Sequence, residues 1–190
     1  MAKVAFVLAD MFEDSEYRVP YDRIRDAGHE VTVVGQDADK ELQGKQGEET
    51  VTPDASADSV SPQDFDALVI PGGYSPDKLR THEGLVKFVR AFFDAEKPVA
   101  AICHAGSLLV EADAVRGRTV TSWPSVRTDM ENAGAKWVDK EVVEDGNLIT
   151  SRNPGDLDAF TSAILGRLCP GTPLSRPRRP ACLPGVAGSR

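Results

Sequence analysis

The sequence predicts an α/β fold in which helices cover both faces of a mostly parallel sheet. Short runs of apolar and β-branched residues alternate along the chain with segments of helical periodicity. The first run, residues 3–8, is apolar almost throughout, which is typical of a strand buried on both faces. A chain of 190 residues with 41% hydrophobic and 27% charged residues can build one core without disulfides. We therefore expect one domain over residues 1–168.

The remaining elements follow from the same alternation. Gly28 is expected just past the end of the first helix, where glycine commonly stands. A hairpin is expected over residues 141–151, with Asp145-Gly146 as its turn. The expected strands are residues 3–8, 30–35, 64–73, 98–103 and 119–121, and the expected helices are 15–27 (with 20 as an alternative start), 85–93, 108–115, 125–133 and 156–168.

Two segments break the alternation. Residues 36–62 are polar and rich in Gly, Asp, Ser and Thr, so we expect a surface excursion that contains a small edge hairpin. Residues 169–190 hold five of the 13 prolines, with four arginines and no acidic residue. This segment is expected to be a disordered appendage, and Cys169 and Cys182 within it are given no role.

Composition excludes several classes of protein. The 30 acidic and 22 basic residues give a net charge of −8, which disfavours binding to nucleic acid or to anionic membranes. The longest apolar run, residues 4–9, is far shorter than the roughly 20 residues of a membrane span. Three cysteines without a CxxC pair and three histidines support neither a disulfide framework nor a metal site. We expect a cytoplasmic protein that uses no cofactor or metal.

Cys103 stands at the junction of an expected strand and an expected helix. A sharp turn there would project the side chain from the carboxyl edge of the sheet, and the small Ala105 and Gly106 give the backbone room. Amide groups at the start of the helix favour the thiolate, so we expect the thiol pKa to lie below about 8.5. The alternative is a small buried apolar residue without chemistry. His104, which follows directly, favours the nucleophile.

Gly72 and Gly73 follow Pro71 at the end of the neighbouring expected strand. Ligands of parallel sheets bind outside the carboxyl ends of the strands, so this turn and Cys103 are expected to share one crevice. The amides of Gly73 and His104 would then hold an oxyanion. A simple turn is the alternative, and the presence of Cys103 favours the binding loop.

An acidic segment, residues 10–16, follows the first expected strand at the same edge of the sheet. We expect Asp14 and Glu16 to be solvated surface groups. Glu13 is expected to lie against Cys103, where a protonated carboxyl group would donate a hydrogen bond to sulfur and preserve a reactive thiolate.

Several separate motifs, in order over about residues 3–168, resemble the PfpI-like intracellular protease and deglycase family. The cysteine turn alone would also fit a class I glutamine amidotransferase. The motifs are Phe12-Glu13-Asp14, Ile70-Pro71-Gly72-Gly73, Ala101-Ile102-Cys103-His104, Thr121-Ser122-Trp123-Pro124, residues 129–134 and Thr150-Ser151-Arg152.

The resemblance implies a flavodoxin-like three-layer sandwich with a nucleophilic Cys103 and with Glu13 as its carboxylic partner. In protease-like members the histidine that corresponds to His104 is oriented by an acid from another subunit, so the resemblance implies a homo-oligomer with the site near its interface. Asp77 occupies the position of that acid, where members usually carry glutamate. Members commonly show Gly-Pro after the histidine, whereas this chain has Ala105-Gly106.

Two further residues are candidates for contact with substrate. The resemblance suggests that Trp123 walls the pocket, and a packed loop aromatic is the alternative. Arg152 would reach substrate carbonyl groups, and a surface arginine before a helix is the alternative.

Three functions remain open at this stage. The leading hypothesis is a stress-protective enzyme whose Cys103 attacks a 2-oxoaldehyde or the early glycation adduct that it forms on a protein or peptide. The second is an intracellular cysteine peptidase with a triad of Cys103, His104 and Asp77 across a subunit interface. The third is a redox sensor or holdase that works through oxidation of Cys103.

Overall fold

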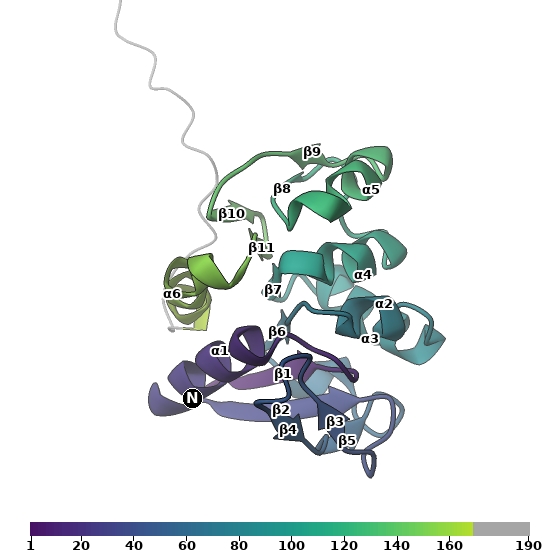
Figure 1. Ribbon diagram of the computed structural model, residues 1–190, viewed down its shortest axis with the longest axis vertical. Coiled ribbons are helices and arrows are strands. Elements are labelled where there is room, and N and C mark those ends of the chain that lie inside the picture. Colours follow the sequence, from purple (N-terminus) through teal and green to yellow (C-terminus); the bar gives the residue numbers. More distant parts are fainter. Residues whose placement is uncertain (169–190) are drawn as a thin grey trace, which may run out of the picture.

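The computed structural model describes residues 1–168 as a sandwich built around a seven-stranded sheet (Figure 1). Every neighbouring pair of strands is parallel except β10 with β11, so the predicted mostly parallel sheet is confirmed. In spatial order the strands are β10 (Val142–Asp145), β11 (Leu148–Ser151), β7 (Val99–Ile102), β6 (Ala67–Ile70), β1 (Lys3–Val7), β2 (Glu30–Gly35) and β5 (Ala55–Ser56).

Helices form the two outer layers (Figure 1). Residues of α1 and α6 pack into the hydrophobic core on one face of the sheet, and residues of α2, α3, α4 and α5 pack into the core on the other. The helices are α1 (Asp14–Asp26), α2 (Ser75–Leu79), α3 (Glu83–Asp94), α4 (Gly106–Glu111), α5 (Arg127–Asn132) and α6 (Leu157–Leu168).

The apolar run in β1 is explained by these two cores. Ala5 and Val7 point into the core beneath α3 and α4, whereas Val4 and Phe6 point into the core beneath α1 and α6. Because successive side chains of a strand alternate between its faces, a strand covered on both sides must be apolar at each position.

The structure adds elements that the sequence pattern did not indicate. Within residues 36–62, β3 (Leu42–Gln43) and β4 (Thr50–Val51) form the expected small hairpin, but β5 joins the edge of the main sheet beside β2. The expected strand at residues 119–121 is present as β8 (Thr119–Val120), and it pairs in parallel with β9 (Lys136–Trp137), which the pattern did not indicate. Short 3-10 turns cover Pro62–Asp64, Cys103–Ala105, Pro124–Val126 and Pro154–Asp156.

Element boundaries differ from expectation at two places that matter for the site. Helix α1 begins at Asp14, earlier than either expected start, and the segment after the Pro-Gly-Gly turn folds into the short helix α2. The predicted appendage over residues 169–190 lies outside the described residues. Within residues 1–168, no helix has both the length and the apolar character needed to cross a bilayer.

Candidate active site

Cys103 occupies a strained turn between β7 and α4. Its φ angle is 63°, in the left-handed region that residues other than glycine rarely adopt. The turn lifts the side chain out of the strand direction at the carboxyl end of β7, as the sequence predicts for a nucleophile elbow. The residue is buried, with 7% of its surface exposed.

Two backbone amides face the sulfur atom. The N–H groups of His104 and Gly73 both donate hydrogen bonds to it and thereby lower the pKa of the thiol. The turn after β6 can approach this closely because Gly73 has a φ of 74° and Gly72 carries no side chain. A Cβ atom at Gly72 would stand 2.7 Å from the Cβ atom of Cys103. The predicted juxtaposition of the two loops is therefore present.

Glu16, rather than Glu13, is the carboxyl group at the sulfur. Its side chain interacts with Cys103 and is fully buried, with Oε2 accepting a hydrogen bond from the amide of Gly72 at 2.8 Å. Its Oε1 atom has no hydrogen-bond partner among residues 1–168. The expectation that Glu16 is a solvated surface group is wrong, because the first turn of α1 runs beneath the elbow.

Glu13 makes a different interaction. It is also buried, but its Oε2 atom lies 2.7 Å from the Nζ atom of Lys45, which extends from the loop between β3 and β4. A carboxylate in an ion pair of this length is not the neutral hydrogen-bond donor that the sequence analysis assigned to Glu13. The carboxyl group that interacts with the Cys103 thiol is therefore that of Glu16, whereas the expected contact was with Glu13.

Asp14 fixes the loop that carries Lys45. Its buried carboxylate accepts hydrogen bonds from the amides of Gln46, Glu48 and Glu49, at 2.8 to 3.0 Å. Gly44 passes so close that a Cβ atom there would overlap Asp14. The expectation of a solvated Asp14 is wrong, because the carboxylate replaces water as the partner of these loop amides.

Burial governs the ionisation of the pair formed by Cys103 and Glu16. Removal from water raises the pKa of Glu16 to about 8, and the nearby charge of Glu13 adds to the effect. Burial also raises the pKa of the Cys103 thiol, and the negative charge of Glu16 raises it further, against the opposing effect of the two amides. The expectation of a thiol pKa below about 8.5 is therefore wrong, since it considered the amides without the desolvation.

His104 lies beside the thiol in a defined orientation. Its Nδ1 atom is 3.2 Å from the sulfur of Cys103, and its Nε2 atom is 3.3 Å from the hydroxyl group of Ser125. The ring stacks on that of Trp123, with 6.2 Å between centroids. Burial, together with the positive charge of Lys45, lowers the pKa of His104, which keeps the imidazole neutral at pH 7.

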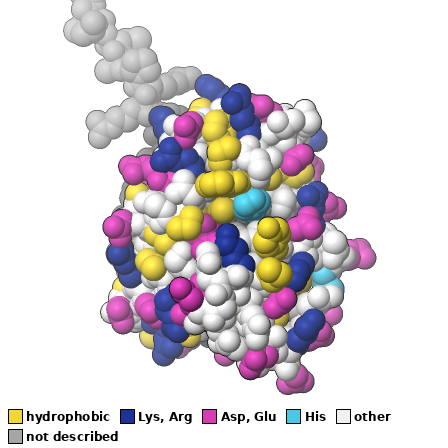
Figure 2. Space-filling model, viewed as in Figure 1, with side chains coloured by type: hydrophobic (Ala, Val, Ile, Leu, Met, Phe, Trp, Pro, Cys, Tyr) yellow, Lys and Arg dark blue, Asp and Glu magenta, His cyan; other side chains and the backbone are white. Residues whose placement is uncertain are grey.

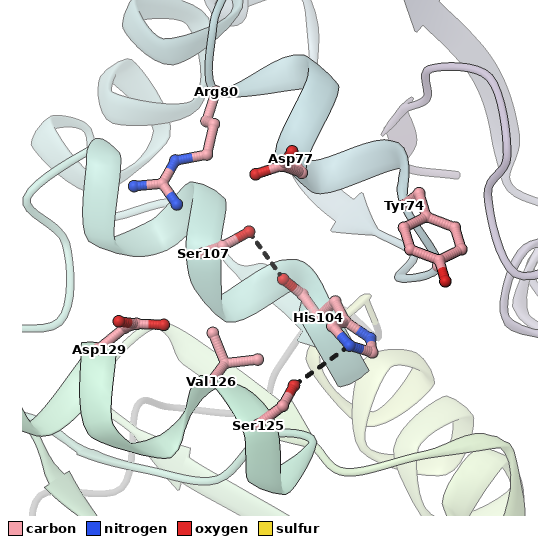
Figure 3. Close-up of a pocket in the computed structure, with 9 residues that line it drawn as sticks. Tyr74, Asp77, Arg80, His104, Ser107, Ser125, Val126 and Asp129 are labelled. Carbon is pink, nitrogen blue, oxygen red and sulfur yellow. Dashed lines mark hydrogen bonds between the residues drawn. The ribbon is translucent and has the colours of Figure 1, made fainter.

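A pocket of about 330 Å³ adjoins the elbow (Figure 3). It begins at Gly73 and His104, the two residues whose amides face the sulfur, and extends between α2, α4 and α5. No group of three or more His, Cys, Asp or Glu side chains in residues 1–168 is arranged to hold a metal ion. The pocket is lined by Gly73, Tyr74, Asp77, Arg80, His104, Ser107, Ser125, Val126 and Asp129.

The structure brings together most of the other predicted site residues. Asp77 lines the pocket from α2, but within residues 1–168 it makes no hydrogen bond to His104. The Nε2 atom of His104 contacts the hydroxyl group of Ser125 instead. Trp123 is at the site through its stacking on His104, and its amide donates a hydrogen bond to the carbonyl oxygen of Cys103. Ser125 and Val126 form the nearby pocket wall.

Arg152 is placed elsewhere. Its guanidinium group makes two hydrogen bonds to Asp156, at 2.8 and 2.9 Å, and one to Asp139 at 2.7 Å. Through these hydrogen bonds Arg152 links the 3-10 turn before α6, which holds Asp156, to the loop between β9 and β10, which holds Asp139. The predicted contact with substrate carbonyl groups is not supported, because Arg152 does not line the pocket.

The surface around the site is partly apolar. Figure 2 shows hydrophobic side chains gathered beside a histidine in the middle of the face turned to the viewer, with basic and acidic groups close by. Apart from Met1, the large hydrophobic side chains exposed within residues 1–168 are Met11, Tyr74 and Trp123. Tyr74 lines the pocket. Trp123 adjoins it by stacking on His104.

Helical periodicity could have identified Glu16 from the sequence. Glu16 stands four residues before Pro20 and eight before Ile24, both of which are buried in α1, so a helix that begins at Asp14 places all three on one face. Lys45 gave no comparable signal, since it lies in a polar loop far from Cys103 along the chain.

Comparisons with known proteins agree with this geometry. General stress protein 18 of Bacillus subtilis (strain 168) is 52% identical over 167 residues, covering 87% of this chain and 97% of that protein. Protein/nucleic acid deglycase 2 of Escherichia coli (strain K12) is 49% identical over 164 residues, covering 86% and 95%. A two-domain protein of Anabaena variabilis with DJ-1/ThiJ/PfpI-like and ferritin-like domains superposes with a TM-score of 0.87 at 42% identity, over 88% of this chain and 48% of that one.

The family model described as the DJ-1/PfpI family matches residues 2–167, which is nearly the whole of the described chain. The resemblance noted from the separate motifs is thereby confirmed. The chain belongs to the DJ-1/PfpI family.

Proposed function

We propose that this chain is a cysteine-dependent, stress-protective enzyme that acts on 2-oxoaldehydes or on the early adducts that they form with proteins and peptides. The observation that carries the proposal is the arrangement at Cys103, where two amides and a buried carboxyl group of raised pKa surround one sulfur atom. Two relatives, which are named as a deglycase and a general stress protein, support the same role.

The first step is addition of sulfur to the aldehyde carbon. The carboxylate form of Glu16 takes the thiol proton while the Sγ–C bond forms, and the carbonyl oxygen becomes an oxyanion. The amides of Gly73 and His104 are the donors available to hold that oxygen. Glu16 then returns the proton to the oxygen, which yields a hemithioacetal on Cys103.

The second step moves a hydrogen within the adduct. Glu16, again ionised, removes the proton from the carbon bound to sulfur and delivers it to the neighbouring ketone carbon, while the hydroxyl proton moves from the first oxygen to the ketone oxygen. The product is a thioester of a 2-hydroxy acid. Water then cleaves the S–C bond, which releases the 2-hydroxy acid and restores the thiol. The sequence consumes one water molecule and needs no external oxidant or reductant.

The raised pKa of Glu16 suits both steps. A carboxyl group with a pKa near the working pH can both accept and return a proton, whereas an ordinary glutamate would hold it too weakly. Turnover is therefore expected to increase as the pH rises toward about 8, because a larger fraction of Glu16 is ionised before sulfur attacks.

Peptide hydrolysis is the second candidate function, and the contact between His104 and Cys103 favours it. A neutral imidazole 3.2 Å from the thiol is a suitable general base. This candidate requires an acid to orient His104, and we propose that Asp77 of a second copy in a homo-oligomer would supply it. Within one chain the hydroxyl group of Ser125 holds that position.

The experiment is a turnover assay with methylglyoxal, which follows both loss of the aldehyde and appearance of lactate. We expect stoichiometric lactate from the wild-type chain and none above background from Cys103→Ala. Cys182→Ala is the matched control, because it removes a thiol outside the described domain, and it should retain wild-type turnover.

Three results separate the candidates. Lactate production by Cys103→Ala at the wild-type rate would refute the proposal. Casein hydrolysis without lactate formation would favour the peptidase. Absence of both activities, with a peroxide-dependent gain of mass on Cys103, would favour a sensor that works through oxidation of the thiol.

A further inference from the structure

Ser125 is a pocket residue that has no part in the proposed reaction with aldehydes. Its hydroxyl oxygen lies 3.3 Å from Nε2 of His104, and Figure 3 shows the side chain directed at the imidazole from the 3-10 turn before α5. The other ring nitrogen, Nδ1, lies 3.2 Å from the sulfur atom of Cys103. The imidazole therefore bridges the hydroxyl group and the reacting sulfur atom.

The segment that carries Ser125 is held in place by hydrogen bonds of its own. Ser122, which is 1% exposed, donates from its hydroxyl group to the carbonyl oxygen of Trp123 and accepts a hydrogen bond from Nε1 of Trp137, each at 3.0 Å. The ring of Trp123 in turn stacks on that of His104. The imidazole is thus held at one face and contacted at both nitrogens, so its orientation toward the sulfur is defined.

The proposed reaction decides which ring nitrogen carries the proton. His104 is neutral because burial and the positive charge of Lys45 lower its pKa, and a neutral imidazole has a single N–H group. When the thiol proton of Cys103 passes to Glu16, the sulfur becomes a thiolate, which can only accept hydrogen bonds. The contact at 3.2 Å is then a hydrogen bond only if Nδ1 carries the proton. Nε2 is left as an acceptor, and the Ser125 hydroxyl group must donate to it.

A carboxylate in the place of this hydroxyl group would have the opposite effect. A carboxylate only accepts hydrogen bonds, so it favours the proton on Nε2 and leaves the lone pair of Nδ1 facing the thiol. That tautomer makes His104 the base that peptide hydrolysis needs. A hydroxyl group can donate as well as accept, which permits the tautomer that the aldehyde reaction needs. The tautomer of His104 therefore separates the two candidate functions.

We propose that Ser125 is a positioning residue that acts through His104, in that its hydroxyl group donates to Nε2 and directs the Nδ1–H group at the Cys103 thiolate. This inference rests on the proposed function. The imidazole loses no proton in the step, since the thiol proton still passes to Glu16. The sulfur then has three N–H donors, because the amides of Gly73 and His104 also face it.

The first test is the ¹⁵N NMR spectrum of the His104 imidazole at about pH 9. Glu16, with a pKa of about 8, is ionised at that pH. We expect a protonated-type shift for Nδ1 and an unprotonated-type shift for Nε2 in the wild type, and a weaker preference between the two in Ser125→Ala. The proton on Nε2 in the wild type would overturn the proposal.

The second test measures kcat for methylglyoxal and the alkylation midpoint of Cys103. In Ser125→Ala we expect kcat to fall about tenfold with little change in KM, because the contact strengthens as the thiolate forms. The midpoint should move to higher pH, since the thiolate loses an oriented donor. Ser125→Thr keeps the hydroxyl group and should restore kcat to within about threefold of the wild type.

Ser162→Ala is the matched control, because it removes the same hydroxyl group from an exposed position on α6, and it should leave both values unchanged. Wild-type kcat and midpoint in Ser125→Ala would overturn the proposal, and so would an equal loss of kcat in Ser125→Thr, which would indicate damage to the turn. Those results with no lactate from Cys103→Ala would leave the proposed function intact. Wild-type turnover by Cys103→Ala would instead refute the proposed function itself.

Discussion

Two groups of carboxylates flank Cys103, and they differ in their burial and in their partners. Glu13, Asp14 and Glu16 at the start of α1 are at most 7% exposed, and each is directed at a particular partner. Asp77 and Asp129, across the elbow, are exposed and unpaired within the described chain. The first group belongs to the packed interior, and the second belongs to the solvent-filled pocket.

The comparison shows how the negative charge of a carboxylate is stabilised when the group is buried and when it is exposed. In the interior its charge is costly, so it is neutralised by a proton, by an ion pair or by several amides, as in Glu16, Glu13 and Asp14 respectively. In the pocket the carboxylate stays in contact with water, so its charge needs no partner from the protein. Substitutions in the first group should therefore change chemistry and stability, whereas substitutions in the second should leave the free energy of unfolding nearly unchanged.

The largest effect is expected from Glu16→Gln. Loss of the group that moves the proton should lower kcat for methylglyoxal by at least about 100-fold, because general acid–base catalysis typically contributes that much. Glu13→Gln, three residues away and also buried, is the matched control and should remain within about tenfold of the wild type. A larger loss in Glu13→Gln than in Glu16→Gln would restore Glu13 as the proton partner and contradict the assignment.

A large effect is also expected from Gly72→Ala. The added Cβ atom would stand 2.6 Å from Oε2 of Glu16 and 2.7 Å from the Cβ atom of Cys103, so it must separate the two reacting groups. We expect turnover to fall by more than tenfold and the free energy of unfolding to fall by about 1–3 kcal/mol. Gly166→Ala is the matched control, because Gly166, like Gly72, has no positive φ but has open space around its Cβ position, and it should keep the wild-type turnover. Full activity in Gly72→Ala would show that the close approach is unnecessary.

An intermediate effect on stability is expected from Asp14→Ala. Three loop amides would lose their partner, and the free energy of unfolding measured by urea denaturation should decrease by about 2 kcal/mol. Asp77→Ala, an exposed position without such partners, should change stability by less than about 0.5 kcal/mol. Similar losses in both variants would remove the contrast between the two groups.

The smallest effect is expected from Lys45→Met. The ammonium group favours the deprotonated forms of Cys103 and His104, so its removal should raise the pKa of both groups. Alkylation kinetics would measure the pKa of the Cys103 thiol, and NMR titration would measure the pKa of the His104 imidazole. Lys45→Arg, which retains the charge, is the control. A downward shift of either pKa would contradict the assigned sign.

Much of the fold could be predicted because it is encoded locally. The apolar run of β1 and the periodicity of α3 and α6 show strands and helices within short windows, and their alternation predicts the parallel sheet. The elbow was predictable for the same reason, since Cys103, His104 and Gly72 lie at the ends of recognisable strands. Their meeting follows from the geometry of parallel sheets.

The rest of the site depends on contacts that no short window contains. Asp14 was expected to be solvated because its partners lie more than 30 residues further along the chain. The partner of Glu13 is likewise a lysine in a polar loop. The pKa of Cys103 could not be predicted from its position at a helix start, since burial and Glu16 oppose the amides.

The most direct test of the account is the pH dependence of Cys103 alkylation by iodoacetamide in the wild type and in Glu16→Gln. The central claim is that the buried carboxyl group and the thiol are one electrostatic unit, in which negative charge on Glu16 raises the pKa of Cys103. The account predicts that the alkylation midpoint moves to lower pH in Glu16→Gln, because the neutral amide no longer repels the thiolate. An unchanged midpoint, or one that moves to higher pH, would contradict it.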